Sequence, residues 1–502
     1  MKSDASATLR RATFPWRRGA PGAFAALVLA CLVLAFPPLA AAAEVASGVA
    51  AEHGGAPHLD GSSMGLIWVL PFAGILLSIA LFPLLAPNLW HHHFGKISAF
   101  WALAFLVPFA LIHGFDLALY EMLHTALLEY IPFIVLLLAL FTVAGGVRVT
   151  GSLTGTPMVN TGLLFLGTMI ASWMGTTGAA MLLIRPLLKA NDGRRHKMHV
   201  VVFFIFLVAN IGGSLTPLGD PPLFLGFLKG VDFFWTTKHM LLPMAMASAI
   251  LLAVFFALDS YLYAKEPPAP VVHKGGEKLG IEGGINILLL GGVIAAVLLS
   301  GVWKPGIGFD VYHVHVEIQN IVRDLLLLGV VALSLKLTTK ENRHLNAFSW
   351  FPILEVAKLF AAIFLTIIPA IAILRAGTDG ALGGVVSAVT TPDGQPINYM
   401  YFWATGLLSS FLDNAPTYLV FFNTAGGDPL HLMHDVPNTL LAISAGAVFM
   451  GANTYIGNAP NFMVKSIAEE RGVNMPSFFG YMIWSGLILI PLFVLTTVVF
   501  FL

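Results

Sequence analysis

The sequence predicts an all-α polytopic membrane protein with two inverted repeats, each containing spanning helices, a re-entrant hairpin and a broken helix. Of its 502 residues, 57% are hydrophobic and only 10% are charged. A helix needs about 20 apolar residues to cross the hydrocarbon core, and runs near that length recur along the chain. In addition, two irregular regions, 150–237 and 399–472, resemble each other in sequence. Composition therefore predicts the membrane class, and internal similarity predicts the repeats.

Apolar length divides the chain into spanning segments and two repeats. We assign eight spans, at about 63–86, 98–113, 118–145, 239–264, 284–303, 323–338, 350–374 and 478–502. The resulting domains are a polar outside segment at 44–62, a first repeat at 63–264, a cytoplasmic linker at 265–283 and a second repeat at 284–502.

Residues 1–43 are predicted to be a signal peptide or a retained first helix. Four arginines precede an apolar run at 24–39, and "AAAAE" at 40–44 has the small residues of a signal-peptidase site. The single cysteine, Cys31, lies in this run, so no internal disulfide can form. If cleavage occurs, the mature chain contains no thiol.

The distribution of Lys and Arg sets the predicted orientation. With 44–62 outside, the inside loops hold 15 basic residues and the outside segments hold five. This asymmetry agrees with the positive-inside rule, and we expect a multi-pass protein of the cytoplasmic membrane. Overall, 26 Lys and Arg balance 26 Asp and Glu, which argues against nucleic acid as a partner.

The two irregular regions match at a constant offset of 238 residues. "SWMGTTGA" at 172–179 aligns with "SFLDNAPT" at 410–417, and "GSLTPLGDPPLF" at 213–224 aligns with "GANTYIGNAPNF" at 451–462. The second pair has five identities in twelve positions. The intervening loop has five basic residues at 185–197 in the first copy and none at 426–438 in the second. Equivalent loops are thus expected on opposite sides of the membrane, as in many secondary transporters.

Prolines and glycines in both motifs predict interrupted helices. Proline cannot donate a backbone hydrogen bond, and glycine weakens a helix. We interpret 158–190 and 399–427 as re-entrant hairpins, and 198–237 and 439–472 as single crossings that break near 214–222 and 452–458. Irregular backbone at membrane depth is tolerated where it is buried in protein or lines a wet cavity. Each motif is therefore expected to border a cavity.

Polar side chains at the hairpin tips and breaks are the candidate ligands. Oxygen-rich cages suit hard cations, and an ionisable group at membrane depth is usually functional. The alternative is that these side chains only cap half-helices. The candidate ion or substrate ligands are Asp413, Asn414, Asn453, Thr454, Asn458, Thr216, Asp220, Thr176 and Thr177. Among them, Asp413, Asn414 and Asn458 are the candidate ligands for sodium.

The motifs "SFLDNAPT" (410–417), "GSLTPLGDPP" (213–222) and "GANTYIGNAPN" (451–461) resemble the ion transporter superfamily. Within it, the chain is similar to NhaD-type sodium/proton antiporters and related citrate carriers, over about 63–502. The resemblance implies one inward-opening and one outward-opening hairpin, and a homodimer. It also implies that the second ion-binding half contains Asp413, Asn414, Asn453, Thr454 and Asn458, and the first Thr216 and Asp220. The chain departs from the dicarboxylate branch, which has "SNT" where this chain has "GTT" and "DNA".

Three classes of function remain open. The leading hypothesis is sodium/proton antiport, because two carboxylates and no Lys or Arg lie within the motifs. The alternative is a sodium-coupled carrier of citrate, dicarboxylate or an inorganic anion, held by helix N-termini. An enzyme would need metal ligands such as His91 to His93 or the "HVHVE" run at 313–317, which we expect in loops without partnered ligands. We expect no enzyme and no cofactor, with sodium as the transported ion.

The predicted topology can be tested with accessibility tags. A tag at Asn191 should report the cytoplasm and a tag at Asp428 the outside, because the two equivalent loops differ so strongly in basic residues. Labelling with a membrane-impermeant reagent in intact cells and in inverted vesicles would measure this. Both tags on one side would contradict the inverted repeat.

Overall fold

The computed structural model describes residues 57, 59–151, 153–266 and 280–502. The predicted signal segment 1–43 and most of the predicted linker 265–283 lie outside these residues. The described chain is mainly helical, with two short antiparallel strand pairs. Strand β1 (Arg148–Thr150) pairs with β2 (Gly280–Glu282), and β3 (Gly308–Val311) pairs with β4 (Val314–Glu317).

Seven helical segments in the described residues are long and apolar enough to cross a membrane. They are η2 with α2 (Leu66–Leu85), α3 (Pro87–His113), α4 through α5 (Phe115–Ala144), α10 (Trp235–Tyr263), α11 (Ile285–Val302), α12 (Ile318–Leu337) and α22 (Phe478–Phe500). An eighth is the pair α14 (Phe351–Thr366) and α15 (Ile368–Arg375), bent by 41°. These helices confirm the prediction of an all-α polytopic membrane protein.

Short elements interrupt or connect the spans. Within the third span, a π turn at Ala126–Tyr130 separates α4 (Phe115–Thr125) from α5 (Ile131–Ala144). The short connecting elements are η1 (Gly61–Ser63), α13 (Lys340–Leu345), η5 (Gly377–Asp379), α16 (Gly383–Val389) and α19 (Pro429–His434).

The expectation that His91 to His93 lie in a loop is wrong. They lie in the first turns of α3, which starts at Pro87 directly after the single residue Ala86. Proline is favourable at the first position of a helix because its fixed φ suits the helix and its missing N–H would be unpaired there. The "HVHVE" run instead forms strand β4 and the turn before it. No group of three or more potential metal ligands occurs in the described part of the chain.

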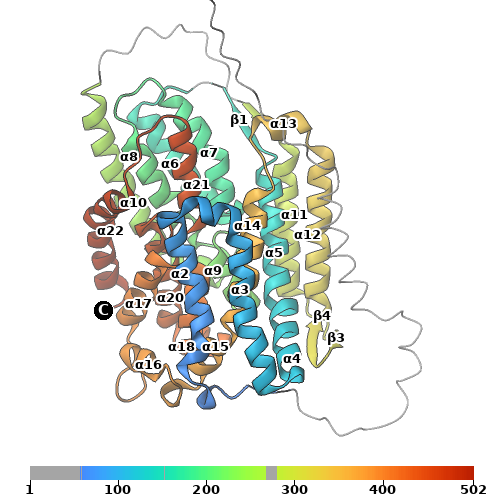
Figure 1. Cartoon of the computed structure of the whole chain (residues 1–502). Coiled ribbons are helices and arrows are strands. Elements are labelled where there is room, and N and C mark those ends of the chain that lie inside the picture. The colour runs from blue at the N-terminus through green and yellow to red at the C-terminus, as the bar shows by residue number, and fades with distance from the viewer. Residues whose placement is uncertain (1–56, 58, 152, 267–279) are drawn as a thin grey trace, which may run out of the picture. The chain divides into compact units, whose positions relative to one another are not determined.

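Two helical hairpins occupy the positions predicted for the hairpin regions. Helix α6 (Pro157–Met174) joins α7 (Thr176–Ala190) at Gly175, whose φ of 81° favours glycine. Helix α17 (Asn398–Phe411) joins α18 (Asn414–Thr424) through two residues. In Figure 1, α6 and α7 lie in the upper half with β1 and α13, whereas α17 and α18 lie in the lower half with α16. The two similar sequences therefore occupy opposite halves of the described structure.

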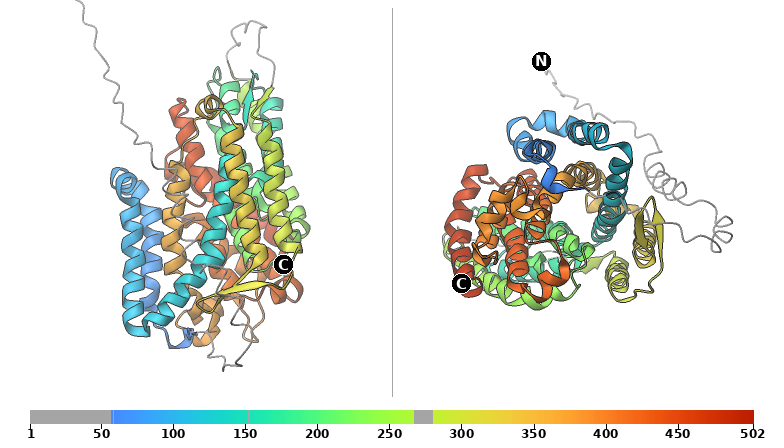
Figure 2. Two further views of the ribbon diagram at one scale, coloured as in Figure 1. Left: turned by 90° about the vertical axis from the view of Figure 1, so that its right-hand side faces the viewer. Right: turned by 90° about the horizontal axis from the view of Figure 1, so that it is seen from below.

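Each crossing that follows a hairpin is broken in the middle. The first consists of α8 (Met198–Leu207), η4 (Ile211–Ser214) and α9 (Pro221–Leu228). The second consists of α20 (Pro437–Met450), η6 (Gly451–Asn453) and α21 (Ala459–Glu470). Helices α8 and α20 are almost completely buried, whereas α2 and α3 lie at the periphery in Figure 2. The irregular backbone is thus enclosed by protein, as backbone at membrane depth requires.

A pair of glycines lets the backbone approach itself at each break. A Cβ on Gly219 would lie 2.1 Å from the carbonyl oxygen of Gly213, and a Cβ on Gly457 would lie 2.6 Å from that of Gly451. Both distances are far inside van der Waals contact, so only glycine fits without a backbone shift. The two pairs are related by the offset of 238 residues.

The structure also refines the placement of the topology tag. The side chain of Asn191 is 1% exposed and exchanges hydrogen bonds with Asn160. A tag there would disturb the fold. Gly193, two residues later, is exposed and has no neighbouring atom within 4 Å of a built Cβ, so it is the better position.

We predict that Gly219→Ala destabilises the protein by about 1–3 kcal/mol or more, because overpacking against a backbone carbonyl forces the break to move. Thermal unfolding in detergent would measure the change. Gly193→Ala is the matched control and should leave the midpoint nearly unchanged, since nothing lies near its Cβ. Equal midpoints for the two variants would contradict the tight packing at the break.

Candidate functional site

Polar residues from both halves of the chain meet at the carboxylate of Asp220. Thr176 donates its hydroxyl to Oδ1 at 3.1 Å, Asn458 donates its amide to Oδ1 at 3.0 Å, and Asn414 donates its amide to Oδ2 at 2.5 Å. Asp220 is 1% exposed, and these three partners are also buried. Four of the nine predicted site residues are therefore in direct contact.

The four residues form two repeat-related pairs. Asp220 and Asn458 are 238 residues apart, and so are Thr176 and Asn414, which is the offset between the two copies of the motif. Equivalent residues of the two halves thus touch the same carboxylate.

The sequence after Asp220 explains why its side chain is available for these contacts. Asp220 is the N-cap residue of α9, and an N-cap carboxylate ordinarily accepts from the second or third N–H of its helix. Here Pro221 and Pro222 have no N–H, and the N–H of Leu223 donates to the backbone oxygen of Asp220. The carboxylate therefore makes no cap and turns to the other motifs. Asn458 at the start of α21 likewise makes no side-chain cap.

Asp413 has a different local role. Its carboxylate accepts the N–H of Ala415 at 3.0 Å and caps α18, and the Thr417 hydroxyl donates to its backbone oxygen at 3.0 Å. The residue is half-buried, whereas its neighbour Asn414 is fully buried against Asp220. The predicted sodium ligands Asn414 and Asn458 thus gather around Asp220, with Asp413 one residue from the centre.

A second set of hydrogen bonds holds each break against its hairpin. The hydroxyl of Thr216 donates to the backbone oxygen of Ser172, and the hydroxyl of Thr454 donates to that of Ser410. The serine hydroxyls donate in turn to Gly212 and Met450 carbonyls. Every partner in the first half has its counterpart 238 residues later. Thr216 and Thr454 therefore fix the backbone of the breaks and do not touch Asp220.

The other predicted residues and some unpredicted ones lie around this centre. Asn453 donates to Ser410, whereas Thr177 makes no side-chain hydrogen bond within the described structure. Sequence reasoning missed Asn210, which donates to Asn461 at 2.7 Å and so joins the two breaks. It also missed the two serines, although both open their motifs at the offset of 238. Asn210 has Val448 at the equivalent position, so no repeat signal marked it.

Two amide oxygens near the centre are buried without a partner. The Oδ1 atoms of Asn414 and Asn453 accept no hydrogen bond within the described structure. An ionised carboxylate only accepts, so Asn414 must present its amide nitrogen to Asp220, which leaves its oxygen unpaired. An unpaired buried acceptor costs free energy. These oxygens could ligate a hard cation, and they are oxygen ligands of the kind that sodium takes.

Four helices begin at the centre. Helix α7 starts at Thr176 and α18 starts at Asn414, while α9 and α21 start directly after Asp220 and Asn458. The helix dipole gives an N-terminus a partial positive charge. In α9 this charge carries few free N–H groups, because Pro221 and Pro222 have none and the N–H of Leu223 is paired. In α18 the Asp413 carboxylate already accepts the N–H of Ala415. Because no Lys or Arg lies within the four motifs, these N-termini are the positive groups that the motifs supply.

A comparison with protein-family models matches residues 61–501 to a family described as "Putative citrate transport". The match covers most of the chain and all four motifs. The chain belongs to this citrate transport family. A search of curated proteins finds no match for the chain.

Membership of the citrate transport family corrects the emphasis of the sequence analysis. The family description is closer to the anion-carrier alternative than to the sodium/proton antiporter. It supports a small anion as substrate and a membrane environment. In this citrate transport family member, convergent helix N-termini provide positive charge where an anion could bind. The absence of basic residues from the motifs therefore does not argue against an anionic substrate.

We predict that Thr176→Val lowers the stability of the protein by about 1.5–3 kcal/mol, because it removes a hydrogen bond to a buried carboxylate without changing side-chain volume much. The thermal midpoint in detergent would measure this. Thr177→Val is the matched control, since the neighbouring hydroxyl makes no such bond, and it should change stability by at most about 0.5 kcal/mol. The opposite order of the two variants would contradict the contact with Asp220.

Proposed function

We propose that this chain is a secondary carrier that moves a citrate-like carboxylate across the cytoplasmic membrane together with a coupling cation. The observation that carries the proposal is the convergence of four helix N-termini and the Asp220 carboxylate within one buried centre. Membership of the citrate transport family supports the class of substrate. The chain acts in this proposal as a carrier and not as an enzyme, and sodium is cargo and not a cofactor.

The charge balance of the centre gives the coupling its physical basis. In the absence of substrate, the Asp220 carboxylate lies where the four helix N-termini meet, and three side chains donate to it. The N-terminus of α18 is capped separately by Asp413. A cation that neutralises Asp220 would leave the N-termini of α7, α9 and α21 without a compensating anion, while Asp413 still caps α18. A substrate carboxylate could then bind to them, as anions do at helix N-termini. Cation and carboxylate would therefore be bound together and transported together.

The cation has candidate ligands on both sides of Asp220. The unpaired Oδ1 of Asn414 already lies in the centre, and Asn458 could rotate its amide to present oxygen once Asp220 no longer requires a donor. Asp413 lies one residue from Asn414 and would supply a second carboxylate. We therefore place sodium among Asp413, Asn414 and Asn458, next to Asp220. A proton on Asp220 would neutralise it equally well.

The arrangement of the two halves suggests how the centre could face each side in turn. Helices α6 and α7 lie in one half of the structure and α17 and α18 in the other, and their tips reach the same centre. We propose that these are the two re-entrant hairpins of an inverted repeat. Rocking of one half against the other around a fixed central site would then give alternating access. A homodimer, as implied by the resemblance to ion transporters, remains part of this proposal.

Sodium/proton antiport is the second candidate. The observation in its favour is that Asn414 links two carboxylates, because its amide donates to Asp220 and it follows Asp413 in the chain. Its Oδ1 has no hydrogen-bond partner within the described structure. A carboxylate in a partly desolvated site can exchange a cation for a proton. Under this candidate, no carboxylate substrate crosses the membrane, and sodium alone dissipates an imposed pH gradient.

The proposal is tested in proteoliposomes with radiolabelled citrate under an imposed sodium or proton gradient. We predict that Asp220→Asn reduces gradient-driven citrate uptake to background, because the amide keeps the shape of the side chain and loses the exchangeable charge. Asp413→Asn should retain the cap of α18, since asparagine caps as well as aspartate, and should lose the dependence on the cation. Asp393→Asn, at an exposed aspartate outside the four motifs, is the control and should transport normally.

Two results would count against the proposal. Wild-type citrate uptake by Asp220→Asn would remove Asp220 from the coupling site. Sodium-dependent dissipation of a pH gradient by the native protein in the absence of any carboxylate would favour antiport instead. Normal coupling in Asp413→Asn would restrict Asp413 to the capping role that its contact with Ala415 shows.

A further inference from the structure

A basic cavity lies at the C-terminal ends of helices α7 and α21, whose N-terminal ends lie at the centre around Asp220. Its volume is about 670 Å³, and it lies between β1, α7, β2 and the end of α21. Four cationic side chains line it, namely Arg148, Arg185, Lys189 and Arg471. Two carboxylates, Asp192 and Glu282, also line it, so the four cations exceed the carboxylates by two. The cavity is large enough for a molecule the size of citrate with its hydration water.

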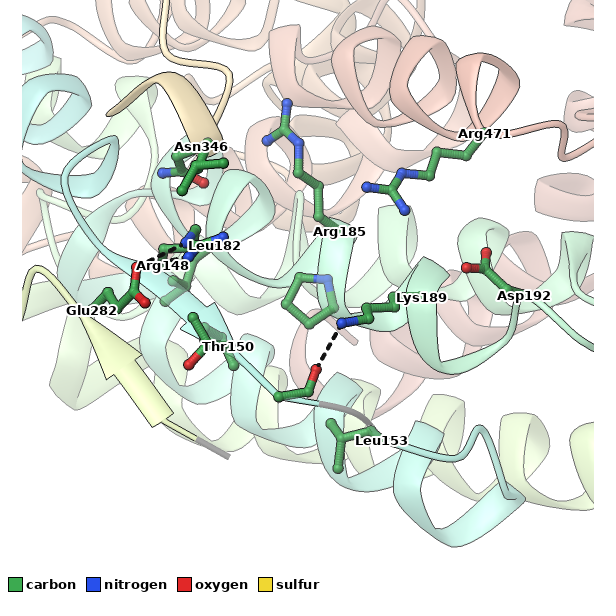
Figure 3. Close-up of a pocket in the computed structure, with 14 residues that line it drawn as sticks. Arg148, Thr150, Leu153, Leu182, Arg185, Lys189, Asp192, Glu282, Asn346 and Arg471 are labelled. Carbon is green, nitrogen blue, oxygen red and sulfur yellow. Dashed lines mark hydrogen bonds and ion pairs between the residues drawn. The ribbon is translucent and has the colours of Figure 1, made fainter. Parts of the chain in front are cut away.

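The charges in the cavity are unevenly paired. Arg148 is neutralised by Glu282, to which it donates at 2.7 and 3.2 Å. Figure 3 shows Arg185 and Arg471 beside each other on the opposite wall, and their charges interact. Glu470, next to Arg471 in the chain, acts on Arg185 as well. Nevertheless, the Nη1 atom of Arg185 is buried and has no hydrogen-bond partner within the described structure.

A simpler account of these cations is incomplete. Basic residues are favoured in inside loops, and cations are favoured near helix C-termini, where α7 and α21 end. Both effects explain why Lys and Arg occur at this end of the protein. Neither requires two guanidinium groups to lie beside each other on one wall of a cavity, and neither supplies a hydrogen-bond partner for the buried Nη1 of Arg185. Like charges at short range repel, and an anion between them would turn that repulsion into attraction.

The cavity is connected to the centre by the two helices themselves. Helix α7 starts at Thr176, which donates to Asp220, and Arg185 lies nine residues further along. At 1.5 Å per residue this is a distance of about 13 Å. Helix α21 starts next to Asn458, packs against α7 and ends directly before Arg471. The same two helices thus present their N-termini to the centre and basic side chains to the cavity.

We propose that this basic cavity is a second anion site, which binds a polycarboxylate of the citrate type before or after it occupies the central site. The identity of the ligand rests on the proposed function, whereas the site itself rests on the cavity and its charges. Arginine binds carboxylates through two parallel hydrogen bonds, so Arg185 and Arg471 suit a ligand with at least two carboxylates. Local positive charge also raises the concentration of anions at the mouth of a transport path.

The test uses the rarity of cysteine in this chain. In a Cys31→Ser background, Thr150→Cys places a neutral thiol reporter in the wall of the cavity and keeps all four cations. We expect citrate to slow labelling of this thiol by a maleimide in the purified protein, and acetate at equal ionic strength to have no effect. Gly193→Cys, exposed in an open loop outside the cavity, is the control reporter and should be labelled at the same rate with and without citrate.

The cations are tested by charge-matched variants of the reporter protein. Replacing both Arg185 and Arg471 by Gln should raise the citrate concentration for half-protection by about tenfold or more, since two charge-assisted contacts are lost. Replacing Arg195 and Lys197 by Gln removes the same charge from a neighbouring loop outside the cavity lining and should change protection by less than about twofold. Equal effects of the two double variants would contradict a specific anion site in the cavity. They would show that citrate responds only to the overall positive charge at this end of the protein.

The same assay separates this site from the central one and from lipid. Protection should persist in an Asp220→Asn background, so that failure of the transport proposal and failure of the cavity proposal give different results. Protection that disappears with Asp220→Asn would place citrate only at the centre and overturn the second site. Protection by vesicles containing phosphatidylglycerol, with none by citrate, would assign the cavity to a lipid headgroup and overturn the proposal as well.

Discussion

The burial of the Asp220 carboxylate is the constraint on which the rest of the described structure depends. An ionised carboxylate away from water is costly unless it is hydrogen-bonded or paired with opposite charge. Here its hydrogen bonds come from three other motifs, and none of these motifs contains a Lys or Arg. The first hairpin, the second hairpin and both breaks must therefore meet at one point. Any movement that separates the halves must also change the state of this carboxylate.

The two breaks are built in the same way, but the centre they enclose is asymmetric. Glycine pairs, serine hydroxyls and threonine hydroxyls make corresponding contacts in both halves. At the centre, however, the residues that correspond at the offset of 238 differ: Asp220 corresponds to Asn458, and Thr176 corresponds to Asn414. Asn458 donates to Asp220. A second aspartate at position 458 would put two carboxylates about 3 Å apart, where both cannot be ionised. One carboxylate and three donors satisfy the site without that conflict.

Charge is distributed along the proposed transport path in two different forms. At the centre, the positive charge is the partial charge at helix N-termini, such as that of α7, which holds its position without long flexible side chains. In the basic cavity, the positive groups are arginine and lysine side chains near the protein surface. Fixed dipoles suit a site that must release its anion, because they carry partial rather than full charges. Full charges suit a surface region that attracts an anion from solution.

The sequence by itself determined the helical membrane class, the eight spans, the duplication and the positions of the breaks. These features depend on local properties, namely apolar length, the missing N–H of proline and the freedom of glycine, which any single copy of the motif displays. The sequence did not determine that residues 87–97 form the start of helix α3. The polar histidines there made a loop plausible, but the structure places them within the helix.

Only the tertiary structure decided which carboxylate occupies the centre. Asp413 was the leading candidate from sequence, yet it caps α18, whereas Asp220 collects donors from residues 194 and 238 positions away. One local signal was present, since Pro221 and Pro222 deny Asp220 the N–H groups that Ala415 offers to Asp413. The partners of Asp220 could not be predicted from the sequence. Local sequence indicates which side chains lack a capping partner, whereas the packing of helices distant in the sequence determines which residues those side chains contact.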